Sequence, residues 1–283
     1  MAYSGKILFG NKKYIFAIAA IFSFGALHAQ VTDTLSPATI TTDSLLNAAK
    51  NVNKKSSNEA VKNKYAKYDL NKRAIDHFMF QFGFLGWANA TGDYTLHGFS
   101  REFNAAFMLD HAFKSNPHYS LGYGIGYSSD NAFMNGKYAD IAGSSSTLSI
   151  TKNGSGNSST SFKKFKLVFS YVEIPLEIRW SNNIEDPSKG LRFAVGLKGG
   201  FLLQAHSKGK NLVSSNGQTQ KGSGYIEKIY DKKYFNTTKA DATFRASLGI
   251  FTLYGTYQLT PLLRSGAGPT INPYSIGIGL SLM

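Results

Sequence analysis

The sequence predicts an all-β fold: an eight-stranded antiparallel transmembrane up-and-down β-barrel, preceded by a mostly disordered or short-helical N-terminal periplasmic segment. Three observations predict it. Eight stretches after residue 76 alternate bulky apolar side chains with small or polar ones, which is the period of a β-strand. The connections between them alternate between long and short, as expected when one end of a barrel carries loops and the other carries turns. The chain also opens like an exported protein.

The first 29 residues have the layout of a secretory signal peptide. Three lysines precede an apolar run from Tyr14 to Leu27, and we expect cleavage after Ala29. This run is shorter than the ~20 apolar residues that a membrane-spanning helix needs. Residues 30–76 are rich in Thr, Ser, Asn and Lys without a sustained apolar face, so we expect a periplasmic linker there and the barrel in residues 77–283.

The strands are expected, in order, at 78–87, 100–113, 118–130, 165–180, 191–203, 241–250, 251–259 and 273–282. The third is the most regular, because Tyr119, Tyr123 and Tyr127 alternate with Ser120, Gly122, Gly124 and their like. The long connections are expected at 88–99, 131–164, 205–240 and 261–272. The short ones are "KSNPH", "SNNIEDPSKG" and a turn near Gly249.

The bulky faces decide between a soluble barrel of the lipocalin kind, apolar inside, and a membrane barrel, apolar outside. About five bulky side chains on each of eight strands exceed what the interior of such a barrel can hold. The apolar face is therefore expected to meet lipid, and a structure that spans lipid must close to satisfy its backbone. Aromatic residues at the strand ends are expected to form the interfacial girdles: Trp87, Tyr119, Tyr127, Trp180, Tyr257 and Tyr274.

Charged residues on the small-residue faces are expected to line the lumen. The acidic ones are Glu102, Asp110, Glu173, Glu177 and Asp241, and the basic ones are Arg179, Arg192, Lys198 and Arg245. Because an unpaired buried charge is costly, we expect a structural network of ion pairs, with a conduction or proton pathway as the alternative. Pro175 removes a backbone donor from a strand without a free edge, which predicts a bulge there.

The segments "YVEIPLEI" (171–178) and "LYGTYQLTPLLRSGAGPTINPYSIGIGLSLM" (253–283) resemble the PorT family of outer-membrane β-barrel proteins of Bacteroidetes. The resemblance runs from about Phe78 to the C-terminus. It implies an eight-stranded outer-membrane barrel and raises the possibility of a role in type IX secretion, although membership alone does not imply that role.

The net charge is +14, or +11 once the three signal-peptide lysines are removed, since residues 1–29 contain no Asp or Glu. The third long connection carries seven lysines against two acidic residues, a surplus of +5: Lys208, Lys210, Lys221, Lys228, Lys232, Lys233 and Lys239. Outer-membrane lipid and lipopolysaccharide are the anionic partners that an exported chain meets, so lipopolysaccharide contact and a merely solvated loop are both open. Secretion-machinery proteins are further possible partners, and no nucleic-acid motif accompanies the charge.

Signals for catalysis are weak. His97, Asp93 and Ser100 lie in or beside the first long connection, in a pattern that could serve a lipid A-modifying enzyme, but solvated loop residues are the simpler interpretation. The histidines at 77, 111, 118 and 206 lack metal-ligand spacing, and the chain has no cysteine. We therefore expect a non-enzymatic outer-membrane barrel without cofactor or metal, structural or secretion-associated, with a narrow solute pore as the alternative.

Overall fold

The computed structural model describes residues 65, 68, 70, 77–134, 136–152, 160–214 and 217–282. The expected signal peptide, almost all of the expected linker and Met283 lie outside these residues. Within the described part, no helix is long and apolar enough to cross a membrane.

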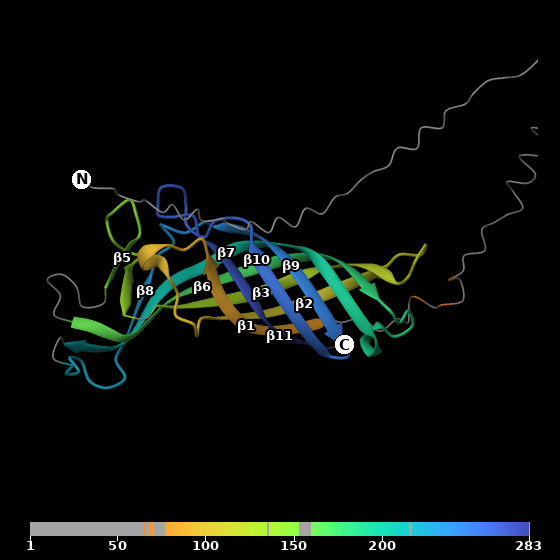
Figure 1. The fold of residues 1–283 in the computed structure, drawn as a ribbon, viewed down its shortest axis with the longest axis horizontal. Helices are drawn as coiled ribbons and strands as arrows, with labels where there is room; N and C mark the ends of the chain where they lie inside the picture. Colours follow the sequence, from red (N-terminus) through yellow and green to blue (C-terminus); the bar gives the residue numbers. More distant parts are fainter. Residues whose placement is uncertain are drawn as a thin grey trace, which may run out of the picture. The chain divides into compact units, whose positions relative to one another are not determined.

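Eight of the strands in the described residues form a closed antiparallel ring. Their order around the ring is β6-β3-β2-β1-β11-β10-β9-β7, and pairing of β7 with β6 closes it (Figure 1). The eight strands are β1 (Phe78–Ala88), β2 (Arg101–Ala112), β3 (Tyr119–Met134), β6 (Thr160–Ser181), β7 (Leu191–Ser214), β9 (Thr238–Leu248), β10 (Phe251–Gln258) and β11 (Asn272–Leu282). The first strand pairs with the last from Phe78↔Leu282 to Ala88↔Asn272, and the predicted barrel is confirmed.

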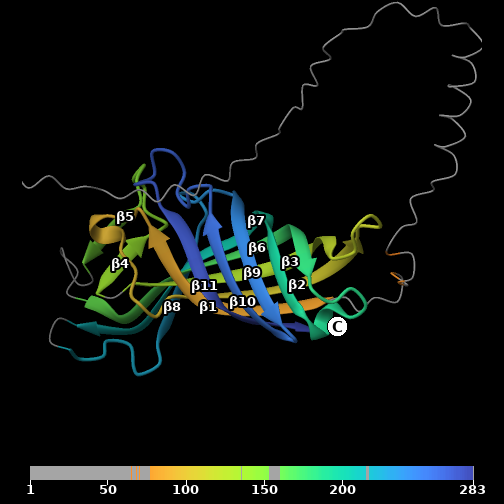
Figure 2. The same ribbon diagram turned by 45° about the vertical axis from the view of Figure 1, so that its right-hand side comes forward.

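The remaining elements belong to the connections. β4 (Lys137–Asp140) and β5 (Ser149–Lys152) form a separate hairpin, and β8 (Ile226–Tyr230) pairs with the far end of β7. Two short 3-10 helices, η2 (Gly92–Tyr94) and η3 (Pro187–Lys189), complete the described elements. In both views β4, β5 and β8 lie at the end of the barrel opposite the C-terminus (Figure 2). Long connections therefore gather at one end, as predicted.

The bulky apolar side chains of the barrel point outward and are exposed. Ile278 on β11 is 70% exposed and Val195 on β7 is 59% exposed, whereas the inward Ser275 and Lys198 are buried. A protein in water would not leave such a continuous apolar surface uncovered, so the surface fits a lipid environment. Trp87 departs from the expected aromatic girdle, because it packs against a buried apolar cluster at the long-connection end.

The face of the barrel that carries the apolar side chains changes from the outside to the inside along β6. Toward its C-terminal end Ile174 and Ile178 face outward and Glu177 faces inward, as in a membrane barrel. Toward its N-terminal end the inward residues are Phe165, Leu167 and Phe169, all buried, and the outward ones include Lys166. The reversal marks where the outer surroundings change from lipid to water, because the apolar side chains turn to whichever side excludes water.

This reversal explains why the strands are longer than the sequence predicts. β3 continues to Met134, β6 begins already at Thr160 and β7 continues to Ser214. Each of these extensions lies in a segment that we expected to be a connection. Beyond the lipid, strands no longer need bulky residues on their outer face, so the pattern that reveals the membrane-spanning part fades.

The predicted bulge at Pro175 is wrong. Strand β3 pairs with β6 through Tyr123↔Leu176 and again through Gly126↔Glu173, so the register is unchanged across the proline and only the pairing at Gly124 and Ile125 is interrupted. Gly124 stands opposite Pro175 in this register, so the barrel tolerates the missing donor by a local gap. The register shift of β6 with β7 lies at Ser170/Tyr171 instead, where Leu203 is the extra residue.

Candidate functional site

The half of the lumen nearer the short turns holds an ion-pair cluster centred on Glu177. Its carboxylate accepts two hydrogen bonds from Arg245, one from Nε, which lies 3.0 Å from Oε1, and one from Nη2. It also accepts one from Nε of Arg179 at 3.2 Å. Arg179 also pairs with Asp110 at 3.4 Å. Two carboxylates and two guanidinium groups therefore balance one another in the low-polarity interior.

Glycines on neighbouring strands give these long side chains room. Gly122 and Gly196 are the register partners of Glu177 on β3 and β7. A Cβ added at Gly122 would collide with the Arg179 guanidinium. One added at Gly196 would collide first with the backbone of Leu176 and Glu177 and would also lie 3.0 Å from Cγ of Glu177. The glycine alternation that identifies the third strand thus has a packing cause.

A second cluster lies higher in the lumen around Glu173. Its carboxylate is 2.6 Å from Nζ of Lys239 and 3.0 Å from Nζ of Lys198, and it accepts a 2.6 Å hydrogen bond from Ser128. Both lysines also approach Asp241, at 3.2 and 3.8 Å. The expected position of Lys239 in an outer loop is wrong, because β9 begins at Thr238 and directs Lys239 inward opposite Gly200.

Three charged residues in the lumen, Glu102, Asp130 and Arg192, lie outside these two ion-pair clusters. Glu102 is buried and accepts a hydrogen bond from Asn104 at 2.8 Å, and its direct cross-strand partner is Asp130, a buried carboxylate that the sequence analysis missed. Continuing the inward period of β3 past Ser128 would have found it. Arg192 donates to the backbone oxygen of Gly249. A cavity of about 10 Å³ between Glu102, Asp130 and the second cluster has room for roughly one water.

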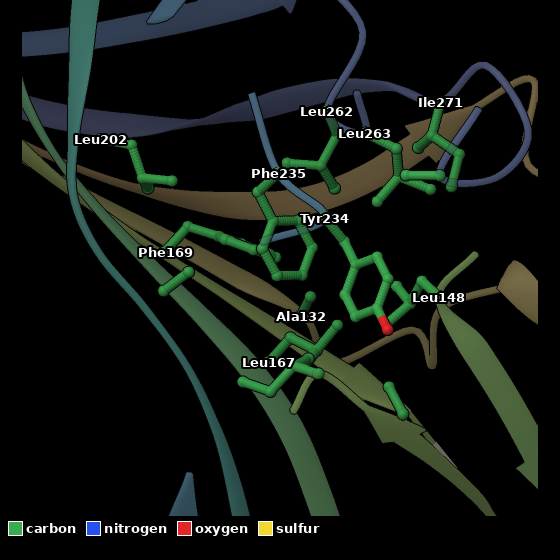
Figure 3. Close-up of a cluster of buried hydrophobic side chains, with 14 of the residues drawn as sticks. Ala132, Leu148, Leu167, Phe169, Leu202, Tyr234, Phe235, Leu262, Leu263 and Ile271 are labelled. Atoms are coloured by element: carbon green, nitrogen blue, oxygen red, sulfur yellow. The ribbon is translucent and has the colours of Figure 1, made fainter. Parts of the chain in front are cut away.

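The long connections fold over the end of the barrel nearest β4, β5 and β8 and share one apolar core. We call this core, with the connections that supply it, the outer cap. Its fully buried residues come from strand interiors and from three of the connections, and the partly buried Tyr94 and Leu96 of the first connection pack against them. Figure 3 labels Ala132, Leu148, Leu167, Phe169, Leu202, Tyr234, Phe235, Leu262, Leu263 and Ile271. The Phe169 and Phe235 rings pack edge to face with centroids 4.8 Å apart.

Hydrogen bonds tie the connections of the outer cap to one another. The Tyr234 hydroxyl lies 2.8 Å from the backbone oxygens of both Gly143 and Ser145 in the β4–β5 hairpin. The hydroxyl of Tyr94, in the first connection, donates to the oxygen of Leu148 at 2.7 Å. Asn236 donates through Nδ2 to two backbone oxygens of the last connection, at 2.7 and 3.0 Å. All four long connections therefore hold one another over the barrel mouth.

A family model described as an outer membrane protein beta-barrel domain matches residues 47–264, about three quarters of the chain. The chain belongs to this family. It is an outer-membrane β-barrel, and in such barrels the long connections face the outside of the cell. A comparison with curated protein sequences finds no significant match.

Among solved structures, two of Ail, the attachment invasion locus protein of Yersinia pestis, are similar to this outer-membrane barrel. One is Ail in complex with the heparin analogue sucrose octasulfate, at 9% identity and a TM-score of 0.30. The other is a further crystal structure of Ail, at 11% identity and a TM-score of 0.31. Each comparison covers 72% of this chain and 95% of Ail.

The residues considered for catalysis do not form a nucleophilic arrangement in this outer-membrane barrel. Ser100 is buried, and its hydroxyl donates to the backbone oxygen of His97 at 3.0 Å and accepts from the backbone nitrogen of Phe133 at 2.9 Å. Asp93 pairs with Lys137 at 3.6 Å. Ser100 thus closes a turn through backbone groups, while the His97 side chain is exposed.

The other histidines make local contacts. Nδ1 of His118 lies 2.7 Å from the Ser181 oxygen at the short-turn end, and Nδ1 of His77 lies 3.4 Å from the Met108 oxygen. The His111 side chain is exposed on β2. No cluster of three or more His, Cys, Asp or Glu suited to a metal ion occurs within the described ranges.

The basic connection divides into three parts. Lys208, Lys210 and Lys228 lie on strands β7 and β8, facing away from the barrel interior. Lys232 and Lys233 donate to backbone oxygens, Lys232 to Leu202 at 3.2 Å and Lys233 to Gly143 and Ser145 at 3.0 Å each. Lys221 lies over the ring of Tyr225 in an exposed turn. The six lysines therefore do not form one loop surface.

Burial and outward-facing cations on β2, β6, β7 and β8 lower the pKa of His206 and of Lys166, which lie among these cations. Burial lowers the pKa of His206, and the nearby Lys228, Lys166 and Lys208 lower it further. Burial likewise lowers the pKa of Lys166, with additional contributions from Lys208, Arg101 and Lys228. The outward face of this region is thus a dense positive surface.

Proposed function

We propose that this outer-membrane barrel is a closed, non-enzymatic contact protein with a structural or secretion-associated role, as its resemblance to the PorT family suggests. The observation that carries the proposal is the double closure of the barrel. Buried ion-pair clusters centred on Glu173 and Glu177 occupy the lumen, and the outer cap covers its outer mouth.

The closure favours a contact role over a solute pore. An ion or sugar entering from outside would have to displace the packed aromatic rings of Phe235 and Tyr234, both at most 1% exposed. It would then have to part buried charge pairs, which costs several kcal/mol for each ion left alone. The surface that remains available to partners is the exposed exterior of the outer cap and of β8.

The backbone hydrogen bonds of Ser100 support the non-enzymatic part of the proposal. A nucleophilic serine needs a base within hydrogen-bond reach and a free approach for substrate. Here the hydroxyl is buried and turned toward the backbone of His97 and Phe133.

Planar-bilayer recording tests the closure. The purified protein, checked for folding by its faster gel migration before boiling, is expected to give no steady conductance. A variant that thins the cap, Phe235→Ala, serves as the comparison, because any conductance it gains reports the contribution of the cap. Steady conductance of the unaltered protein would overturn the closed-barrel proposal and favour the pore.

A deletion strain tests the role in the cell. A secretion-associated barrel predicts that cargo of the type IX system accumulates inside the deletion strain and is released again on complementation. Normal secretion would remove the secretion role and leave the structural one. A change in the mass of lipid A, restored by the intact gene and not by His97→Ala, would contradict the non-enzymatic assignment.

A further inference from the structure

Four cations form a continuous row on the outward face of the barrel, above its apolar band. Lys166 on β6 is the register partner of Lys208 on β7, and Lys208 is the partner of Lys228 on β8. On the other side, the ring of Phe133 lies between Lys166 and Arg101 of β2, whose cationic atoms are 5.2 and 5.8 Å from its centroid. We call Arg101, Lys166, Lys208 and Lys228 the cation row.

The cation row lacks the acidic partners that the lumen cations have. Within the described part of the chain, no carboxylate forms an ion pair with any of its four members, whereas Lys198 and Lys239 each contact two carboxylates. The nearby Glu227 lies on the opposite face of β8 and accepts a hydrogen bond from Tyr225 at 3.0 Å. Like charges directly opposite one another on paired strands are unfavourable. An anion bound from outside would relieve this repulsion.

The height of the row matches the headgroup region of the outer leaflet. Arg101 is the next outward residue above the exposed Phe103, and Lys208 lies five residues beyond the exposed Leu203 on β7. At ~3.3 Å per residue and a tilt of about 40°, these positions lie roughly 5 to 13 Å beyond the apolar band. Phosphates of outer-leaflet glycolipids occupy this zone, just outside the hydrocarbon.

A hollow lies at the foot of the row. β9 leaves β7 after Phe201↔Thr238 and β8 joins it only at His206↔Tyr230, so no strand pairs with the edge of β7 between these points, although single hydrogen bonds link it to Thr237, Asp231 and Lys232. The hollow has a volume of about 310 Å³ and is lined by Leu203, Gln204, Ala205, Tyr230, Asp231 and Lys232. Its lining combines an apolar side, toward lipid, with hydroxyl, amide and charged groups that suit a sugar.

We infer that the cation row binds the phosphate groups of lipopolysaccharide in the outer leaflet, with the hollow beside Tyr230 receiving part of the glycolipid. The inference takes only the orientation of the barrel from the proposed function. It would fix the rotational position of the barrel relative to its lipid neighbours, because the row covers β2, β3, β6, β7 and β8 and leaves the β1, β11 and β10 side without it.

The test measures binding of fluorescent bisphosphorylated lipid A to the full-length protein in nanodiscs. The test variant combines Lys166→Gln, Lys208→Gln and Lys228→Gln. The control variant removes the same charge elsewhere, through Lys163→Gln, Lys189→Gln and Lys221→Gln, all exposed and outside the row. Gel migration before boiling and the conductance test establish separately that each variant is folded and closed.

The row variant is expected to bind lipid A about 100-fold more weakly, the effect of removing three cations near an anionic surface. The affinity of the control variant for lipid A should stay within about threefold of that of the unaltered protein. Dephosphorylated lipid A should bind weakly to the unaltered protein and to both variants. Inorganic phosphate should compete only at far higher concentration than lipid A. Equal losses in both variants, unchanged binding in the row variant, or equal binding of dephosphorylated lipid A would overturn the inference. So would tight binding of heparin with none of lipid A, which would indicate a polysaccharide partner.

Discussion

Replacing Glu177 by Gln should destabilise the barrel strongly, although the two side chains have nearly the same shape. Glu177 has a side chain only 2% exposed and accepts hydrogen bonds from Arg245 and Arg179. The amide removes the negative charge and turns a donor group toward the guanidinium groups. Removing one partner of a buried ion pair costs about 3–5 kcal/mol, so we expect a loss of that size in the free energy of unfolding.

Urea unfolding in phospholipid vesicles, followed by the gel shift between folded and boiled protein, measures this loss. Glu185→Gln is the matched control, since Glu185 is exposed in the turn between β6 and β7, and it should change stability by less than about 0.5 kcal/mol. The double variant Glu177→Met with Arg245→Met should recover most of the loss, because apolar groups of similar volume can replace a buried pair. If Glu177→Gln and Glu185→Gln unfold alike, lumen water screens these charges and the reasoning is refuted.

Three further predictions concern other parts of the molecule. Gly124→Ala should lower the free energy of unfolding by about 1–3 kcal/mol in the same assay, because its Cβ would press on the β2 backbone. Gly255→Ala is the control and should be tolerated, because the nearest atom to its Cβ would be 3.7 Å away. Equal effects of the two changes would exclude crowding as the cause. Phe235→Ala should destabilise the outer cap by about 3–5 kcal/mol, because the ring it removes is fully buried. Proteolysis of the long connections should become faster while the barrel keeps its gel mobility. Unchanged proteolysis would mean that the cap does not depend on this ring. His206 has a pKa lowered by burial and by nearby lysines, so the stability it contributes is present above its ordinary pKa of 6.5 and is lost as the pH falls from there through the lowered pKa of the folded state. Lys208→Gln should raise this pKa, as followed by NMR of the imidazole, and no change would mean that Lys208 does not contribute to the shift.

The membrane-spanning part of the fold could be predicted from the sequence because lipid imposes a simple rule on it. Each spanning strand must show bulky apolar groups on one face, so alternation identifies the strands, and the glycine-rich face of β3 locates the lumen. The same alternation indicates which charged residues face inward. It cannot indicate which of them pair, because pairing depends on the register between strands far apart in the sequence, such as Glu177 and Arg245.

The outer part could not be predicted in the same way. Beyond the lipid the strands obey the rule of a protein in water, and the apolar residues needed for the cap are spread over four connections without a common period. The sequence predicts a loop position for Lys239 for this reason, since the start of β9 lies where the pattern is weakest. The cation row could not be predicted either, because Arg101, Lys166 and Lys208 come from three separate strands and meet only when the barrel closes.

The shared core of the outer cap limits how the exposed surface of this barrel can vary. Surface loops of most barrels can lengthen, shorten or change sequence one at a time. Here a change in one connection alters a packing partner of the other three, as the bonds from Tyr234 to the β4–β5 hairpin illustrate. Diversification of the sequence under immune or phage pressure would therefore be confined to the exposed tips. The turn around Gly222 and Gly224 is the place to insert an epitope tag or a label, because side chains added there would meet no neighbouring atoms. A residue that replaces either glycine must accept its positive φ.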